Sequence, residues 1–226
     1  MTRYVALACD YDGTLASDGA VDEATLAALG HVRATGRQLI LVTGRELDEL
    51  MGVCPHLALF RRVVAENGAV LYRPASHEIR LLAEPPTERF VAALRERGVD
   101  PVAVGRVIVA TWTPHESAVL DVIRDLGLEL QVIFNKGAVM VLPSGVNKAT
   151  GLKAALDELG LDPRNTVGVG DAENDHAFLS LCGYAVAVAN ALQSVKDDAD
   201  IVTDGARGAG VIELIDRLIA SDLRDL

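Results

Sequence analysis

Residues 4–14 read Tyr-Val-Ala-Leu-Ala-Cys-Asp-Tyr-Asp-Gly-Thr, an apolar run that ends in two aspartates and a glycine. The six apolar residues from Tyr4 to Cys9 predict a buried strand. Asp10 and Asp12, directly after it, could provide nucleophilic and acid/base chemistry or hold a hard cation. A strand-ending turn rich in aspartate and glycine is the structural alternative.

Short apolar runs and amphipathic stretches alternate outward from this segment. Continuous apolar strands separated by helices are typical of a parallel sheet that is covered on both faces. The further predicted strands are Gln38–Val42, Arg62–Ala65, Thr166–Val169, Ala185–Ala189 and Asp200–Val202. The predicted helices are Val21–Ala34, Arg45–Met51, Lys148–Leu159, Asn174–Cys182, a short one near Leu192, and Gly210–Ala220.

The pattern changes between residues 83 and 146. This part predicts a helix, two β-rich segments, a second helix and a hairpin around Asn135-Lys136-Gly137, in the order αββαββ. We therefore expect an α/β protein with a doubly wound, Rossmann-like parallel sheet as its core, formed by residues 1–82 and 147–226. Residues 83–146 are expected to form a small inserted α+β cap.

Composition excludes several classes of protein. The formal charge of −11 would repel the phosphate backbone of nucleic acids and an anionic lipid surface. No apolar stretch approaches the ~18 residues of a membrane span. The N-terminal apolar run is also too short for a secretory signal, and the three cysteines are widely spaced without a CxxC. We expect a cytoplasmic protein that binds neither nucleic acid nor membranes.

Polar residues follow three further predicted strands or begin a helix. Thr43-Gly44-Arg45 follows the second strand, where a hydroxyl group and helix-terminal amides could bind an anion. Lys148, one of four lysines, could supply a fixed positive charge to a phosphoryl group. Gly170-Asp171-Ala172-Glu173-Asn174-Asp175 adds carboxylates at another strand end. Because ligands of open α/β sheets bind at the carboxyl ends of the strands, these groups could form one site.

The four motifs, in this order, resemble those of the haloacid dehalogenase superfamily. The matching residues are Asp10-x-Asp12-Gly13-Thr14, Thr43-Gly44-Arg45, Lys148, and Gly170-Asp171-x-x-Asn174-Asp175. The insert between the second and third motifs resembles the C2B cap of Cof-like, sucrose-phosphatase-like and archaeal-type phosphoglycolate phosphatases. The resemblance implies a Mg²⁺-dependent phosphatase of a small phosphate monoester, either a sugar phosphate or a phosphoglycolate-like compound.

The resemblance also implies roles for individual residues. Asp10 would form an aspartyl phosphate, and Asp12 would act as general acid and base, with burial or the like charge of Asp10 keeping it protonated. The implied phosphate-binding residues are Thr43, Gly44, Arg45, Lys148 and Asn174, and the implied Mg²⁺ ligands are Asp10, Asp12 through its backbone carbonyl, Asp171 and Asp175.

Other interpretations remain open from the sequence. A phospho-receiver-like signalling domain or a non-catalytic phosphate-binding module could also use an acidic site on a doubly wound sheet. Glu66-Asn67-Gly68 is interpreted as a structural turn near the cap hinge. Trp112, Phe134, Arg106 and Lys136 lie in the insert. Some cap residue must select the leaving group, but the sequence does not identify which one, and Trp112 and Phe134 are expected to pack in a core. We expect a monomer or a homodimer.

Overall fold

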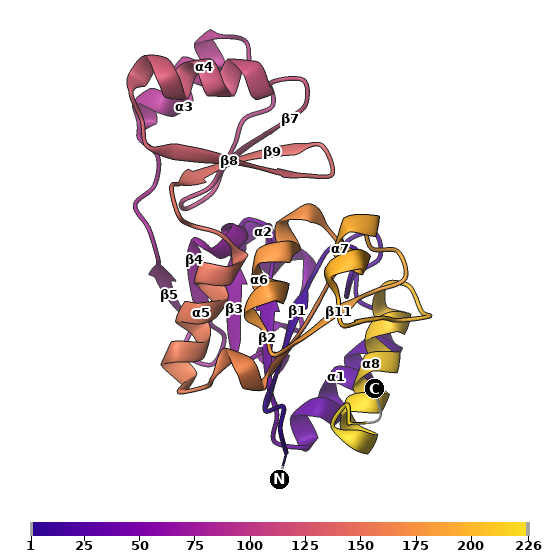
Figure 1. The fold of residues 1–226 in the computed structure, drawn as a ribbon. Coiled ribbons are helices and arrows are strands. Elements are labelled where there is room, and N and C mark those ends of the chain that lie inside the picture. The colour runs from indigo at the N-terminus through magenta and orange to yellow at the C-terminus, as the bar shows by residue number, and fades with distance from the viewer. Residues whose placement is uncertain (1, 225–226) are drawn as a thin grey trace.

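The computed structural model describes residues 2–224 and contains two sheets in two stacked bodies (Figure 1). The larger sheet has eight strands in the order β12-β11-β10-β1-β2-β3-β4-β5, and the smaller has four in the order β6-β7-β9-β8. This arrangement confirms the expected doubly wound α/β core with a small α+β cap.

The bounds of the core strands follow the predicted ones closely. The parallel strands are β1 (Ala6–Asp10), β2 (Gln38–Val42), β3 (Arg62–Ala65), β10 (Thr166–Gly170), β11 (Tyr184–Ala187) and β12 (Ile201–Val202). The strand β1 is shifted from the predicted Tyr4–Cys9, so that Asp10 is its last residue and pairs with Val42 of β2.

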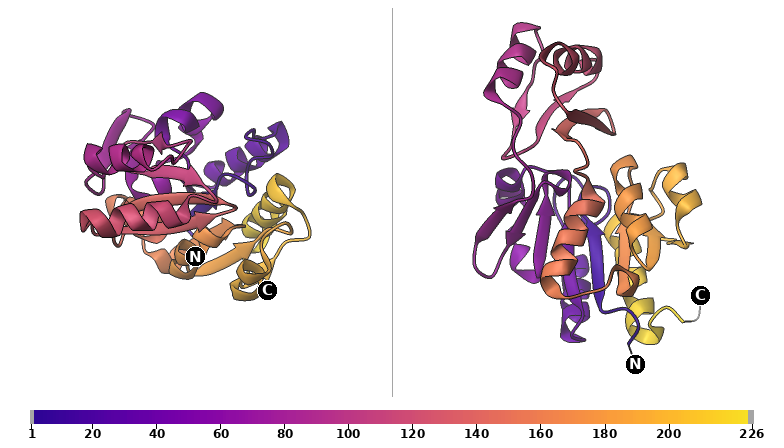
Figure 2. Two further views of the ribbon diagram at one scale, coloured as in Figure 1. Left: turned by 90° about the horizontal axis from the view of Figure 1, so that it is seen from above. Right: turned by 60° about the vertical axis from the view of Figure 1, so that its left-hand side comes forward.

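Helices cover both faces of the large sheet. They are α1 (Glu23–Ala34), α2 (Leu47–Val53), α5 (Lys148–Leu159), α6 (His176–Leu181), α7 (Gln193–Asp198) and α8 (Arg207–Ser221). The helices α5 and α6 pack together on one face, and α1 packs against α8 on the other, as seen when Figures 1 and 2 are compared. The helix α1 begins at Glu23, slightly later than the predicted Val21, because Asp22 caps it by accepting a hydrogen bond from the Thr25 amide.

The large sheet continues beyond the predicted strands. The strands β4 (Val70–Arg73) and β5 (Glu78–Leu81) extend it as antiparallel neighbours of β3, so the sheet is mixed rather than wholly parallel. Alternation of strands and helices predicts only the parallel part, because antiparallel neighbours need no crossover helix.

The cap has the predicted αββαββ order. Its elements are α3 (Glu88–Glu96), β6 (Ala103–Val104), β7 (Val109–Trp112), α4 (Glu116–Leu126), β8 (Leu130–Asn135) and β9 (Ala138–Pro143). The expectation that Trp112 and Phe134 pack in a core is wrong, because Trp112 is 54% exposed and Phe134 is 46% exposed. Both lie near the ends of cap strands, at positions that the apolar clusters do not enclose.

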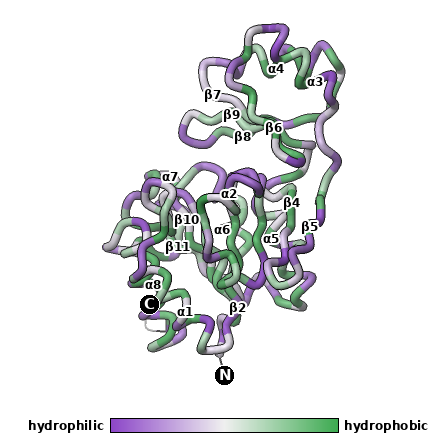
Figure 3. The backbone as a smooth tube through the Cα atoms, turned by 180° about the vertical axis from the view of Figure 1, so that it is seen from behind, coloured by the Kyte–Doolittle hydropathy of each residue, from purple (hydrophilic) through white to green (hydrophobic). Residues whose placement is uncertain are grey.

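Apolar residues form the interior of both bodies. The core strands are hydrophobic along their length and the loops between elements are largely hydrophilic (Figure 3). A second apolar cluster, which includes Phe90, Val119 and Val141, lies between the cap helices and the cap sheet. Among residues 2–224, no helix is long and apolar enough to span a membrane.

Candidate active site

The predicted site residues gather at the carboxyl edge of the large sheet. Asp10 ends β1, Thr43 follows β2, and Asp171 follows β10, which is the other neighbour of β1. Parallel strands bring these ends to one edge of the sheet. Asp10, Thr43 and Asp171 are all buried.

Lys148 connects two of the carboxylates. It is the first residue of α5, where Asn147 caps the helix by accepting hydrogen bonds from the Ala149 and Thr150 amides. The Nζ of Lys148 lies 2.6 Å from Oδ1 of Asp10 and 2.6 Å from Oδ1 of Asp175. Lys148 is buried, so these ion pairs are not weakened by bulk water.

The carboxylates of Asp10, Asp171 and Asp175 form a compact acidic cluster. One oxygen from each lies within 4.8 Å of the others, and such a set of hard oxygen ligands suits Mg²⁺. Asp175 accepts hydrogen bonds from the backbone amides of Asp171 and Ala172 through Oδ2, while its Oδ1 binds Lys148. Asp175 therefore also fixes the turn that carries Asp171.

Burial shifts the ionisation of this cluster. Burial, together with the nearby charge of Asp175, raises the pKa of Asp10 to about 8 against the pull of Lys148. Burial also raises the pKa of Asp171, although Lys136 opposes this. Burial lowers the pKa of Lys148, but the carboxylates of Asp10 and Asp175 outweigh it, so the pKa is raised overall. When all three carboxyls are ionised, they carry one negative charge more than Lys136 and Lys148 balance. A bound cation would neutralise that charge and so favour the ionised form of Asp10.

The environment of Asp12 differs from the expected one. Its carboxylate accepts two hydrogen bonds from Arg45, from Nε at 2.6 Å and from the terminal nitrogen at 2.7 Å. The Asp12 side chain is 43% exposed. Neither burial nor a like charge encloses it as expected, because its carboxylate is half-exposed and faces the guanidinium of Arg45. Arg45 also pairs with Glu49 of α2.

The remaining predicted residues lie around this centre. The hydroxyl oxygen of Thr43 accepts a hydrogen bond from the Arg45 amide at 3.1 Å. Asn174 is buried and donates from Nδ2 to Oδ1 of Asn67, 2.9 Å away, while its own Oδ1 has no partner among the described residues. Gly44 lies beside Asn174, because a Cβ placed on it would be 3.4 Å from the Asn174 amide nitrogen.

Three residues near the site were not predicted to belong to it. Asn190 donates to the Gly13 carbonyl at 2.8 Å, and it directly follows the predicted strand Ala185–Ala189, which the structure ends earlier, at Ala187. The rule of strand carboxyl ends would therefore have identified it. Lys136, at the tip of the cap hairpin, binds Oδ2 of Asp171 at 2.6 Å. Glu66 accepts hydrogen bonds from backbone amides of the cap, and no sequence pattern indicates such a contact.

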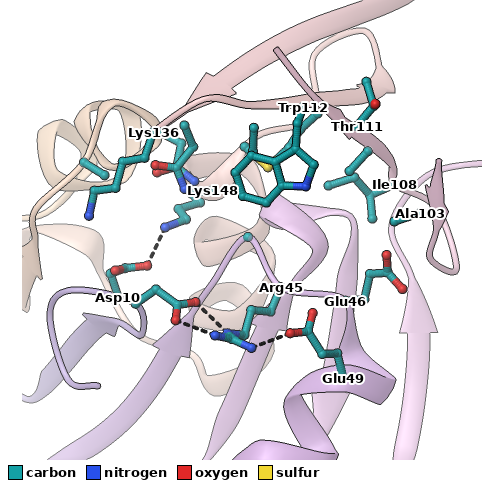
Figure 4. A pocket seen from close by; sticks show the side chains of 18 of the residues that line it. Asp10, Arg45, Glu46, Glu49, Ala103, Ile108, Thr111, Trp112, Lys136 and Lys148 are labelled. Carbon is teal, nitrogen blue, oxygen red and sulfur yellow. Dashed lines mark hydrogen bonds and ion pairs between the residues drawn. The ribbon is translucent and has the colours of Figure 1, made fainter. Parts of the chain in front are cut away.

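A cavity of about 450 Å³ lies between this edge and the cap. From the core it is lined by Asp10, Asp12, Gly44, Arg45, Glu46, Glu49, Lys148, Ala172 and Asn174. Figure 4 shows Asp10 and Arg45 on its floor and Lys136 and Trp112 reaching in from the cap. A small molecule bound here would contact both bodies.

Comparison with known proteins identifies the family. The family model of haloacid dehalogenase-like hydrolases matches residues 7–111 and 121–215. The chain belongs to this family. It is 33% identical over 227 residues to a phosphoglycolate phosphatase of Natronomonas pharaonis, covering 93% of this chain and 96% of the relative. It is 35% identical over 222 residues to one of Haloarcula marismortui, covering 92% and 95%.

Solved structures of haloacid dehalogenase-like hydrolases share the fold. A HAD/COF-like hydrolase of Plasmodium vivax superposes with a TM-score of 0.82 at 20% identity, covering 99% of this chain and 97% of that chain. A haloacid dehalogenase-like hydrolase of Bacteroides thetaiotaomicron gives a TM-score of 0.76 at 20% identity, covering 95% and 99%. The likeness extends over both the core and the cap.

Proposed function

We propose that this hydrolase is a Mg²⁺-dependent phosphatase that cleaves a small phosphate monoester through an aspartyl phosphate on Asp10. The observation that carries the proposal is the buried cluster of Asp10, Asp171 and Asp175 around Lys148 on the floor of the cavity. The relatives named phosphoglycolate phosphatases support a small ester as the substrate.

Asp10 is the proposed nucleophile. Lys148 holds its Oδ1, which orients the carboxylate at the end of β1 toward the cavity. Attack of an Asp10 oxygen on phosphorus would form the new O–P bond while the ester O–P bond breaks. Water would then attack the aspartyl phosphate, breaking the Asp10–phosphorus bond and releasing inorganic phosphate.

Asp12 is the proposed acid and base of the two steps. It would give a proton to the leaving ester oxygen and then take one from the attacking water. Asp12 lines the cavity, but Arg45 holds both of its carboxylate oxygens. We propose that the side chain of Asp12 turns away from Arg45 to reach the leaving group, while Arg45 stays in place through Glu49.

The acidic cluster is the proposed Mg²⁺ site. Asp10, Asp171 and the Asp12 backbone carbonyl would hold the ion, with Asp175 as a further ligand or as support for Asp171. The bound ion would neutralise the carboxylates and polarise the phosphoryl group. The residues fit this role, since three buried carboxylates are balanced by only Lys148 and Lys136 among their ion-pair partners in residues 2–224.

The proposed phosphate-binding residues are Thr43, Gly44, Arg45, Lys148 and Asn174. Gly44, Lys148 and Asn174 line the cavity next to Asp10, so they could bind the phosphoryl oxygens directly. Such catalysis rests mainly on positioning and electrostatic stabilisation of the transferring group.

The test measures phosphate release from p-nitrophenyl phosphate and phosphoglycolate, with Mg²⁺ and with excess chelator. We expect turnover that requires Mg²⁺, and a loss of about a thousandfold or more in Asp10→Asn. Asp157→Asn, an exposed change on α5, is the control and should retain wild-type turnover. Absence of metal-dependent turnover in the wild type would overturn the proposal. One-time phosphorylation without turnover would instead support the receiver-like alternative.

A further inference from the structure

The cap side of the cavity has one charged residue among the described residues that line it. The lining residues from the cap are Pro101, Ala103, Ile108, Ala110, Thr111, Trp112, Asn135, Lys136, Ala138 and Met140. Only Lys136 carries a charge, and the others are apolar or neutral. The cap therefore meets a substrate with a mostly apolar surface and a single ammonium group.

The turn between β8 and β9 positions Lys136 at the cavity. Lys136 lies in this tight turn, where its φ of +48° and the +90° of Gly137 reverse the chain. The Gly137 carbonyl accepts a hydrogen bond from the Thr113 amide at 3.0 Å, which ties the turn to the end of β7. The lysine thus points from the cap onto the acidic edge of the core (Figure 4).

The other cations of the cavity are already engaged by core carboxylates. Arg45 is held by Asp12 and Glu49, and Lys148 is held by Asp10 and Asp175. The side chain of Lys136 is 46% exposed and binds one carboxylate, that of Asp171. If Asp171 is a metal ligand, as proposed above, its charge is shared with the cation, and the ammonium of Lys136 is left to bind another anion.

We propose that Lys136 is the specificity-determining residue of the cap and binds a carboxylate carried by the leaving group. This inference rests on the proposed function and narrows it to phosphate esters of small hydroxy acids. The Nζ of Lys136 lies 2.6 Å from Asp171, whose carboxylate is within 4.8 Å of an Asp10 oxygen. An anion bound by Lys136 would therefore lie only a few bonds from phosphorus.

The rest of the cavity supports this position for the anion. Glu46 and Glu49 line the cavity on the side away from Lys136 (Figure 4), and they would repel a carboxylate placed there. Burial, with nearby Glu66 and Glu49, raises the pKa of Glu46, which is consistent with an excess of negative charge on that side. Within the cavity, a leaving-group anion is therefore stabilised beside Lys136 and destabilised at the far wall.

A pair of matched substrates tests the proposal. Phosphoglycolate carries the carboxylate, and 2-hydroxyethyl phosphate has a hydroxymethyl group in its place. In Lys136→Met, the ratio of kcat/KM for phosphoglycolate to that for 2-hydroxyethyl phosphate should fall about 10- to 100-fold, as expected for a lost charged hydrogen bond. Lys136→Arg should recover most of the ratio. Lys153→Met, an exposed lysine on α5, is the control and should leave the ratio unchanged.

A binding measurement separates recognition from turnover. Trp112 is the only tryptophan of the chain and lines the cavity, so its fluorescence reports on ligand binding. In an Asp10→Asn background with Mg²⁺, adding Lys136→Met should weaken phosphoglycolate binding about tenfold or more.

Three outcomes would overturn the inference. If Lys136→Met leaves the ratio unchanged, Lys136 does not bind the leaving-group carboxylate, and equal losses for both esters would then assign it to the phosphoryl group or the metal. If the wild type hydrolyses 2-hydroxyethyl phosphate but discriminates against phosphoglycolate, the phosphatase proposal stands and this inference fails. If the wild type hydrolyses no ester, the proposed function itself fails and the inference falls with it.

Discussion

Gly68 allows Lys148 to reach the nucleophile. It is the last residue of the 3-10 turn η2 (Glu66–Gly68) and has a φ of +105°. A Cβ on Gly68 would lie 1.9 Å from the carbonyl oxygen of Asn147, the residue that caps α5. Gly151 in the first turn of α5 is also closely packed, because a Cβ there would lie 2.6 Å from the Cα of Gly68. The helix start can rest on η2 only where both residues lack side chains.

Gly68→Ala should therefore displace the start of α5. We expect a loss of about 2 kcal/mol or more in unfolding free energy, from the positive φ and the backbone clash together, and a lower kcat because Lys148 moves. Chemical denaturation and steady-state kinetics measure the two effects. Gly98→Ala is the matched control, since Gly98 has a φ of +75° with no atom near the added Cβ. Equal losses of unfolding free energy in the two variants would show that the backbone strain at a positive φ, and not the contact with α5, causes the effect.

The site residues that could be predicted from the sequence lie at the carboxyl ends of apolar strands. Asp10, Thr43 and Asp171 follow apolar strands, so their place at one sheet edge could be inferred from the strand order alone. Lys136 could not be assigned in this way, because its contact with Asp171 depends on how the cap docks. The exposure of Trp112 was missed for the same reason, since a β-rich pattern does not say which face of a cap sheet meets solvent.

At the scale of elements, Glu66 ties the cap to the core. The Glu66 side chain is buried and accepts hydrogen bonds from the backbone amides of Arg106, Val107 and Ile108, at 3.0, 2.7 and 2.9 Å. These three residues lie in the loop between β6 and β7. The turn Glu66–Gly68, interpreted from the sequence as a structural turn near the cap hinge, is thus also a contact between the two bodies.

Glu66→Gln should loosen this loop. An amide side chain has one oxygen where the carboxylate has two, so at least one cap amide loses its acceptor at a cost of about 1–3 kcal/mol. Hydrogen exchange of residues 106–108 should become about 5- to 100-fold faster. Asp48→Asn is the comparison, because Asp48 binds the side chain of Arg106 in the same loop but is exposed. Its effect should stay below about 1 kcal/mol. Unchanged exchange in Glu66→Gln would contradict the role of this contact.

Glu158 ties α5 to the antiparallel edge of the sheet. Its carboxylate accepts hydrogen bonds from Arg62 of β3, Arg73 of β4 and Arg80 of β5. Hydrogen bonds from Arg73, then from Arg62 and Arg80, outweigh burial and lower the pKa of Glu158 to about 2. The strands β4 and β5, which the sequence pattern did not predict, are thus held to a helix that it did predict.

The low pKa of Glu158 gives stability a defined dependence on pH. Because the folded-state pKa lies below the unfolded value of about 4.3, the contribution is fully present above pH ~5 and is lost as the pH falls through about 2. Glu158→Gln should lower the free energy of unfolding by about 1 kcal/mol at pH 7, since solvent screens the partly exposed arginines. It should also make the loss of unfolding free energy between pH 5 and 2 smaller than in the wild type. Thermal unfolding across this range measures both. Asp157→Asn, exposed on the same helix, should change neither quantity. If stability fell with pH in the same way in the wild type and in Glu158→Gln, Glu158 would not be a source of the pH dependence.

At the scale of the whole molecule, the protein has two hydrophobic interiors. One lies on both faces of the large sheet and includes four cap residues that pack with the core, namely Val107, Ile108, Met140 and Leu142. The other lies within the cap, between α3, α4 and the small sheet. The cap therefore has an apolar core of its own and also a face that packs on the site.

We propose that residues 83–146 form a separately cooperative unit, and that its movement against the core admits the substrate and excludes water.

Phe90→Ala tests this division. Phe90 of α3 is fully buried in the cap interior, and its truncation should remove about 3–5 kcal/mol of local stability. If the cap opens as a unit, hydrogen exchange should accelerate across residues 88–143, whereas β1, β2 and β10 should keep their wild-type protection. Leu156→Ala, in the core cluster under the large sheet, is the matched control and should accelerate exchange of the core strands. If Phe90→Ala accelerated hydrogen exchange equally in core and cap, the two bodies would unfold together. Residues 83–146 would then not form a separately cooperative unit.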